Sequence, residues 1–282
     1  MRCGGRPSRV SETTKISEPV KQGDGIAIQP IDTLEGFSRC VDLQQEVWGF
    51  ADSDAIPRRM FVVAYKAGGQ VLGAFDQSLP GGAGDLRNMV GYVLSIPGYR
   101  NRHSYLHSHM LAVRAAYRNR RIGQRLKLAQ RDDALKKGIE LMEWTFDPLE
   151  IKNAFMNIER LGAIARRYVV DLYGATSSEL QTGMPSDRLY AEWWLNSRRV
   201  TSLLEGGTLP RIPPVNKVEV PAQIYEWRSS TLDRQKALDV QRRNREALRL
   251  AFADGLSVVG FARDAAGNGT YELAAWDEPW KY

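Results

Sequence analysis

Residues 107–123 read HSHMLAVRAAYRNRRIG, and a segment with helical spacing follows them at once. His107 to Arg114 has the apolar, β-rich composition of a strand. Ile122 to Lys137 carries apolar residues at helical intervals and is stopped by Gly138. The stretch therefore predicts a strand that runs into a basic turn, and a helix that opens at the end of that turn.

The basic turn has the composition of an anion-binding site. Backbone N–H groups at a helix N-terminus, together with the positive end of the helix dipole, suit a pyrophosphate. Further positive charge comes from Arg118, Arg120, Arg121 and Arg125. On charge alone, however, these arginines are more typical of a solvated helix face.

The segments on either side predict a mixture of strands and helices. Before the stretch, strands are expected at 26–31, 61–65, 71–75 and 90–96, with 61–65 and 71–75 paired as a hairpin, and a helix is expected after the capping pair Asp32 and Glu35. After it come a strand at 139–146, a helix at 149–161, a strand at 167–173, and a short helix or aromatic anchor at 187–195. Beyond the prolines at 210, 213 and 214, a strand at 218–220, a helix at 231–253 and a hairpin of 257–261 with 271–275 are expected.

Composition excludes several classes of protein. The chain has 282 residues, of which 43% are hydrophobic and 26% are charged, so most of it is expected to fold. Its two cysteines, Cys3 and Cys40, give no disulfide framework, and a reducing cytoplasm is the expected location. The longest apolar runs, such as Met60 to Tyr65, are far shorter than the ~20 residues of a membrane span. A net charge of +6 favours an anionic partner, for which a nucleotide cofactor is sufficient.

Residues 118–123, Arg-Asn-Arg-Arg-Ile-Gly, resemble the signature Arg/Gln-x-x-Gly-x-Gly/Ala of the GNAT superfamily, the acyl-CoA-dependent N-acetyltransferases. The first arginine and the last glycine match, whereas Arg121 stands at the middle glycine and Ala115 at the usual proline before the turn. The order of elements over residues 26–175 also fits the family. The runs Trp144–Asn153, Arg160–Ala163 and Asp187–Trp194 look like a bacterial branch of it.

The resemblance implies a fold and a domain division. The fold would be a mixed, mostly antiparallel GNAT-type sheet flanked by helices, an α/β (α+β) arrangement with a C-terminal αβ extension. Residues 1–24 are expected to be a disordered tail, residues 25–200 the acyltransferase domain and residues 201–282 the extension, which consists of a strand, a helix and a β-hairpin.

The resemblance also implies cofactor-binding residues for acetyl-CoA or another acyl-CoA as co-substrate. The backbone of the strand end would pair with the pantetheine arm, the turn would hold the pyrophosphate, and an asparagine of the later helix would approach the pantetheine. In this sequence these are Leu111, Ala112 and Val113, then Arg118, Asn119, Arg120, Arg121, Ile122 and Gly123, and finally Asn153.

Acyl transfer to an amine needs a base and preferably an acid for the departing thiolate. Many members of the family have a tyrosine as acid four residues before the helix-ending glycine, where this chain has Ile158. Tyr168 or Tyr117 would have to replace it. Glu143 or Asp147 would orient a base or the acceptor amine, although a surface or ion-pair role is the more common one for such residues.

The histidines form a second group of catalytic candidates. All three lie in one segment, as His103, His107 and His109, and alternation along a strand puts His107 and His109 on one face. Three readings stay open: a structural pair, a general base with a near-neutral pKa, and a metal pair for which no third ligand is evident. Trp193 and Trp194 are expected to pack in the core rather than line a pocket.

The expected function is therefore acyl transfer, acetyl or alternatively succinyl, from acyl-CoA to a primary amine of a small molecule such as an amino acid. A catalytically silent acyl-CoA-binding or regulatory protein is the first alternative, and a nucleic-acid-binding protein is the second. No metal and no membrane partner are expected, and a homodimer is left open.

Overall fold

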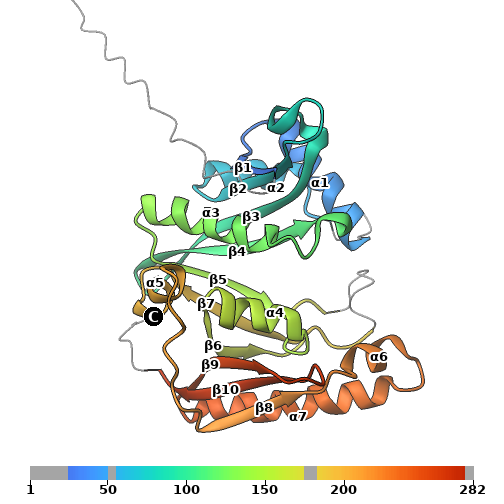
Figure 1. The fold of residues 1–282 in the computed structure, drawn as a ribbon, viewed down its shortest axis with the longest axis vertical. Coiled ribbons are helices and arrows are strands. Elements are labelled where there is room, and N and C mark those ends of the chain that lie inside the picture. The colour runs from blue at the N-terminus through green and yellow to red at the C-terminus, as the bar shows by residue number, and fades with distance from the viewer. Residues whose placement is uncertain (1–24, 50–54, 175–182, 277–282) are drawn as a thin grey trace, which may run out of the picture.

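The computed structural model describes residues 25–49, 55–174 and 183–276. Within them, ten strands form one sheet in the order β1-β2-β3-β4-β5-β7-β6-β9-β10-β8 (Figure 1). The strands are β1 (Ile26–Pro30), β2 (Gln70–Asp76), β3 (Met89–Arg100), β4 (His103–Val113), β5 (Leu141–Phe146), β6 (Ile164–Val169), β7 (Arg188–Trp194), β8 (Asn216–Val220), β9 (Leu256–Arg263) and β10 (Gly269–Ala275). The helices are α1 (Leu34–Trp48), α2 (Arg58–Lys66), α3 (Ile122–Lys136), α4 (Ile151–Phe155), α5 (Arg198–Leu204), α6 (Ile224–Ser229) and α7 (Arg234–Ala253). The predicted tail at 1–24, with Cys3, lies outside the described residues.

Strands β1 to β4 are antiparallel neighbours, and helices cover both of their faces. Phe37 and Leu43 of α1 and Phe61 of α2 pack with Tyr92 of β3 in one apolar cluster. Ile122 of α3 belongs to a second cluster with residues of β1, β2 and β3. The helix α3 is thereby fixed across the first four strands.

The prediction of a strand at 61–65 was wrong, because this segment lies inside α2. Phe61 and Ala64, three residues apart, are both buried, whereas Val63 between them is exposed. That three-residue spacing is helical, and it outweighs the strand preference of the β-branched pair at 62–63. The predicted cap of α1 was also displaced, since Thr33, not Asp32, accepts a hydrogen bond from the backbone of Gly36 at 3.1 Å.

The pairing of β4 with β5 decides where a site can open. These two strands are parallel, and they pair only at Leu106 with Met142 and at His107 with Glu143. Beyond those pairs their ribbons diverge (Figure 1). The mixed, mostly antiparallel sheet with flanking helices that the resemblance implies is confirmed.

The segment 187–195 is not a helix, because residues 188–194 form β7. Leu189, Ala191 and Trp193 face the core, and the residues between them point to the other side. Upstream, the strand expected at 167–173 lies at 164–169 instead, and the helix expected at 149–161 is a short α4 followed by a π-helical stretch, Met156–Arg160.

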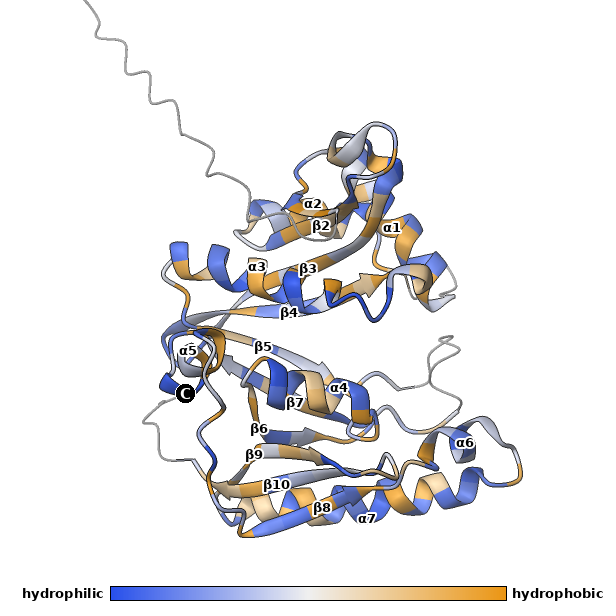
Figure 2. Ribbon diagram, in the orientation of Figure 1, coloured by the Kyte–Doolittle hydropathy of each residue, from blue (hydrophilic) through white to orange (hydrophobic). Residues whose placement is uncertain are grey.

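The C-terminal residues continue the same sheet. Strand β9 pairs with β6 at Ala165 and Val258, and β10 and β8 follow as antiparallel neighbours. The helix expected at 231–253 starts at Arg234 and is preceded by the separate α6. Figure 2 shows hydrophobic and hydrophilic residues alternating along α7, which packs against β6, β8 and β9. In the part of the chain that the structure describes, no helix is both long and apolar enough to cross a membrane.

Candidate functional site

The turn between β4 and α3 has a strained backbone and an open helix end. Asn119 and Arg121 have φ angles of 64° and 58°, in the left-handed region that glycine tolerates best. Arg121 is the N-cap of α3, and its side chain makes no capping hydrogen bond. The first N–H groups of an α-helix have no intrahelical partner, so this end of α3 offers donors to an anion.

The arginines of the turn differ in what they do. Arg118, Arg120 and Arg121 are exposed, and the guanidinium of Arg120 lies 5.1 Å from the centre of the Tyr117 ring. Arg125 instead donates to the carbonyl oxygen of Ile26 at 2.6 Å. Three of the four arginines predicted for this site therefore lie on the surface of the turn. The fourth, Arg125, connects α3 to β1 by its hydrogen bond.

Gly123 lies where the turn, β4 and the π-helical stretch after α4 meet. A Cβ atom at this position would lie 3.4 Å from Cδ2 of Leu111 and 3.7 Å from Cε of Met156, which is ordinary contact. The φ of Gly123 is not positive, so neither the backbone dihedral nor these neighbours exclude a side chain at this position. Ile122, the residue before it, is buried under the sheet.

A β-bulge divides β4 at His109. Ser108 pairs with Ser95 of β3 and Met110 pairs with Leu94, so His109 is an extra residue in the register. A bulge of this kind disrupts the ladder locally and re-aims side chains. After the bulge, Leu111 and Val113 pack on the α3 side, and Ala112 is buried on the side of α1 and α2.

The two asparagines of the later helical segment differ in position. Asn153, the residue predicted from the resemblance, is exposed on α4. Asn157 is buried instead, and its Oδ1 accepts a hydrogen bond from Nε1 of Trp144 at 3.2 Å. The sequence analysis did not predict that Asn157 is buried. Its position directly before the fully buried Ile158 was the available signal.

His107 and His109 lie close together, as their strand spacing predicts, with ring centres 6.0 Å apart. The ring of His107 is also 6.5 Å from that of Tyr190 on β7. Burial, assisted by His109, lowers the pKa of His107 from its usual 6.5 to about 4, and burial lowers the pKa of His109 too. Among the described residues, no three His, Cys, Asp or Glu side chains are grouped so that they could hold a metal ion.

Beside His107, a network of ion pairs crosses β5, β6 and β7. Glu143 and Glu192 are each 2% exposed. Glu143 pairs with Arg100 at 3.0 Å and with Arg167, and Glu192 pairs with Arg167 at 3.1 Å and with Arg166 at 2.9 Å. Three guanidinium groups thus face two carboxylates beside the histidines.

Asp147, which the sequence placed with Glu143, has a different role. Its carboxylate accepts from the backbone of Leu149 at 2.8 Å and pairs with Arg228 of α6 at 2.9 Å. It therefore holds the start of the α4 segment and the C-terminal residues together.

The tyrosines considered as acids are held by other groups. Tyr168 donates to Asp187 at 2.5 Å, and Arg245 of α7 holds the same carboxylate at 2.8 and 3.0 Å. Burial and the Asp187 bond raise the pKa of Tyr168 far above its usual 10. Tyr117 donates to Asp76 at 2.8 Å. Ile158 is fully buried in the core, and so is Trp193, whose Nε1 donates to the carbonyl oxygen of Leu161.

Sequence reasoning missed one buried cation at the point where β4 and β5 separate. Lys127 of α3 is only 4% exposed, and its Nζ donates to Oγ of Ser108 at 2.7 Å. The pattern held a signal, because Lys127 shares a helical face with Gln130 and Ala134, which are also buried.

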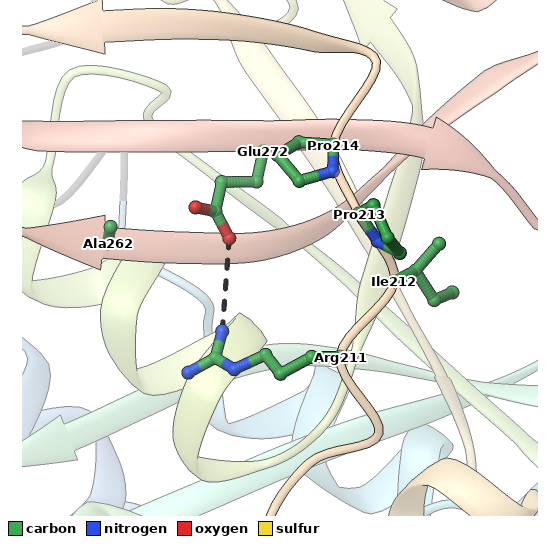
Figure 3. A pocket seen from close by; sticks show the side chains of 6 residues that line it. All are labelled: Arg211, Ile212, Pro213, Pro214, Ala262 and Glu272. Atoms are coloured by element: carbon green, nitrogen blue, oxygen red, sulfur yellow. Dashed lines mark ion pairs between the residues drawn. The ribbon is translucent and has the colours of Figure 1, made fainter.

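A hollow of about 330 Å³ lies elsewhere, at the proline-rich linker (Figure 3). It is lined by Arg211, Ile212, Pro213, Pro214, Ala262 and Glu272. The guanidinium of Arg211 already pairs with Glu159 at 3.1 Å and with Glu272 at 3.8 Å. None of the site residues predicted from the sequence lines this hollow.

No family model matches the sequence, and no curated protein matches it either. Several solved structures resemble the chain. NAA60 of Arabidopsis thaliana in complex with acetyl-CoA is 13% identical, with a TM-score of 0.48, over 60% of this chain and 99% of that one. The ribosomal-protein-S18-alanine N-acetyltransferase from Escherichia coli is 12% identical, with a TM-score of 0.46, over 61% and 95%. An aminoglycoside 6'-acetyltransferase of type Ii is 18% identical, with a TM-score of 0.46, over 61% and 98%. These likenesses concern the fold and leave the acceptor open.

Proposed function

We propose that this chain is an acyl-CoA-dependent N-acyltransferase that acylates the primary amine of a small molecule. One observation carries the proposal: β4 separates from β5 after His107, and the separated half of β4 leads into the arginine-rich N-terminus of α3. A long ligand with a diphosphate at one end and a thioester at the other matches both features. Acetyl or succinyl is the proposed acyl group, and an amino acid is the proposed kind of acceptor.

The residues of β4 and the turn fit an acyl-CoA. In this proposal Arg118, Asn119, Arg120 and Arg121, with the N–H groups of Ile122 and Gly123, hold the pyrophosphate. Leu111, Ala112 and Val113 offer their backbone to the pantetheine arm, and Asn153 lies on the helix that would border it. Gly123 lies beside Leu111 and Met156, so the turn proposed for the pyrophosphate adjoins the strand proposed for the pantetheine arm.

The acceptor amine is proposed to bind beside His107, where the ion pairs of Glu143 and Glu192 line the sheet. An attacking amine must lose a proton, and an imidazole with a lowered pKa is neutral at pH 7 and free to accept it. His109 lies two residues further along β4, at the bulge, with its ring centre 6.0 Å from that of His107, and is a second candidate. The three arginines against two carboxylates favour an acceptor that itself carries a carboxylate.

A silent acyl-CoA-binding protein is the second candidate, and a specific observation favours it. Ile158 occupies the position of the family's usual acid, and Tyr168 and Tyr117 are both held by aspartates. A nucleic-acid-binding role has less support, because the exposed arginines gather on one turn rather than along a surface with interleaved aromatic residues.

The proposed setting is the cytoplasm of a bacterium, with residues 25–200 as the acyltransferase domain and the residues after 200 as its extension. The test is a thermal-shift series with acetyl-CoA, succinyl-CoA and free CoA, followed by mass spectrometry of a panel of amino acids and other small amines incubated with the best donor. A ligand that binds the folded state raises its melting temperature. Stabilisation by acyl-CoA with an acylated amine supports the enzyme, stabilisation without any product supports the silent protein, and no stabilisation contradicts both.

A further inference from the structure

Lys127 lies at the apex of the opening between β4 and β5. The last parallel pair joins His107 to Glu143, and the next residue on each strand is Ser108 on β4 and Trp144 on β5. The Nζ of Lys127 donates to Ser108 at 2.7 Å and lies 3.6 Å from the centre of the Trp144 ring. This ammonium therefore touches the first residue of each strand beyond their last contact.

The surroundings of Lys127 hold no counter-charge among the described residues. Ser108 donates to Oε1 of Gln130 at 2.9 Å, and Nε2 of Gln130, although buried, has no hydrogen-bond partner within the described ranges. A buried charge without a carboxylate partner is costly, and so is a buried polar atom left unsatisfied. Neither is needed to hold α3 on the sheet, where an apolar side chain would pack with less cost.

The charged groups on neighbouring elements point elsewhere. Glu143 of β5 is held by Arg100 and Arg167 on the other face of the sheet. His107 of β4 lies on that other face as well, beside Tyr190. On α3 itself, Arg131 donates to the carbonyl oxygen of Leu195 at 3.0 Å. Burial lowers the pKa of Lys127 well below its usual 10.5.

We propose that Lys127 is the acid that protonates the departing thiolate of CoA, in place of the tyrosine that the chain lacks at Ile158. This proposal rests on the proposed acyltransferase function. Its geometric basis is that the histidine pair and the lysine lie on opposite faces of the sheet at the same level of β4. A base for the attacking amine and an acid for the departing sulfur can then act from opposite faces of the sheet.

The proposed reaction is the transfer of the acyl group from CoA to the amine. The amine nitrogen forms a bond to the thioester carbonyl carbon, and the carbon–sulfur bond breaks with its electron pair on sulfur. The ammonium of Lys127 gives one proton to that sulfur and becomes a neutral amine, while the attacking nitrogen loses one proton to His107. Each residue then exchanges one proton with water, so the products are the amide and CoA thiol.

Lys127→Met tests the proposal, because methionine nearly matches the length of the apolar stem and removes the buried ammonium together with its hydrogen bond to Ser108. With acetyl-CoA and the acceptor found in the amine panel, we expect kcat to fall about a hundredfold to ten-thousandfold. KM for acetyl-CoA should stay near the wild-type value, and the fall in rate at alkaline pH should disappear. Lys136→Met, at an exposed position of the same helix, is the matched control and should leave both constants unchanged.

A second readout uses free CoA and needs no turnover. The ultraviolet absorbance of the bound thiolate is titrated in the wild-type complex and in Lys127→Met, and a neighbouring ammonium should lower the pKa of the bound thiol only in the wild type. Ser108→Ala, which removes the hydrogen bond that positions Nζ, should give an intermediate effect and serves if Lys127→Met does not fold.

The outcomes separate this proposal from the function on which it rests. If Lys127→Met binds CoA but keeps the wild-type kcat, alkaline limb and thiol pKa, the acid is not Lys127 and the acyltransferase stands. If the wild-type chain binds no CoA, the acyltransferase proposal itself falls, and this one falls with it.

Discussion

Arg121 carries a conformation that its side chain does not favour. Its φ of 58° lies in the left-handed region, at the position where the GNAT signature has a glycine. A non-glycine residue pays about 1 kcal/mol or more there. Arg121→Gly is therefore expected to raise the free energy of unfolding by up to ~1 kcal/mol, as measured by urea denaturation. Arg121→Ala removes the same charge but keeps the strained backbone, so a gain of the same size in Arg121→Ala would show that charge, not φ, is responsible.

The lowered pKa of His107 predicts that the free energy of unfolding depends on pH. Its folded pKa is about 4 and the unfolded value is 6.5, so the unfolded chain binds more protons between these values. The contribution of the neutral imidazole is complete above pH 6.5 and is lost as the pH falls toward 4. The difference in unfolding free energy between the wild type and His107→Gln should shrink by on the order of 2 kcal/mol over that interval. A difference that stays constant from pH 7 to pH 4 would contradict the burial of this ring.

At the residue scale, the sequence predicted that Gly123 lies at the start of α3 and that His107 and His109 lie close together, but not that Lys127 is buried. A lysine between apolar residues is normally solvated, and only the packing of α3 over Ser108 and Trp144 shows that this one is buried. The bulge at His109 could not be predicted from the sequence either, because it depends on which residues of β3 pair with β4.

At the scale of elements, helix α1 has two candidate N-cap residues, Asp32 and Thr33, which mutation can distinguish. Thr33 accepts from the backbone of Gly36, whereas the sequence favoured Asp32. Thr33→Ala should lower the free energy of unfolding by about 1 kcal/mol, as measured by chemical denaturation. Asp32→Ala is the matched control and should change it by less than ~0.5 kcal/mol. A larger effect from Asp32→Ala than from Thr33→Ala would restore the original assignment.

The segment in helix α2 was predicted as a strand, and the segment in strand β7 was predicted as a short helix or aromatic anchor. In both segments the local amino-acid composition is a weak guide to secondary structure. The run at 61–65 has β-branched residues, yet it covers the sheet beside α1. The run at 187–195 has the alternation of a strand, yet its bulky aromatic residues suggested an anchor. In each segment the secondary structure depends on the buried residues against which it packs, and those residues are distant in sequence.

At the scale of the whole molecule, the resemblance predicted a mixed, mostly antiparallel sheet with flanking helices and the place of the α3 turn, but the predicted hairpin of 61–65 with 71–75 was wrong. It did not predict that β9, β10 and β8 would continue the same sheet beyond β6. That continuation depends on one contact between strands, Ala165 with Val258, at a separation in sequence that no local pattern reports. The α3 turn and the separation of β4 from β5 are the two features on which the proposed function depends.

The most direct test is calorimetric titration of acetyl-CoA into the wild type, Gly123→Ala and Gly123→Glu. The alanine variant adds a Cβ at an ordinary contact distance of 3.4 Å from Leu111 and is the matched control. Glutamate adds bulk and a negative charge at the helix end where the pyrophosphate is proposed to lie. We expect the wild type and Gly123→Ala to bind acetyl-CoA with similar affinity, and Gly123→Glu, although folded, to lose about tenfold to a hundredfold or more. Equal affinity in all three, or no binding by the wild type, would contradict the assignment of this turn to acyl-CoA.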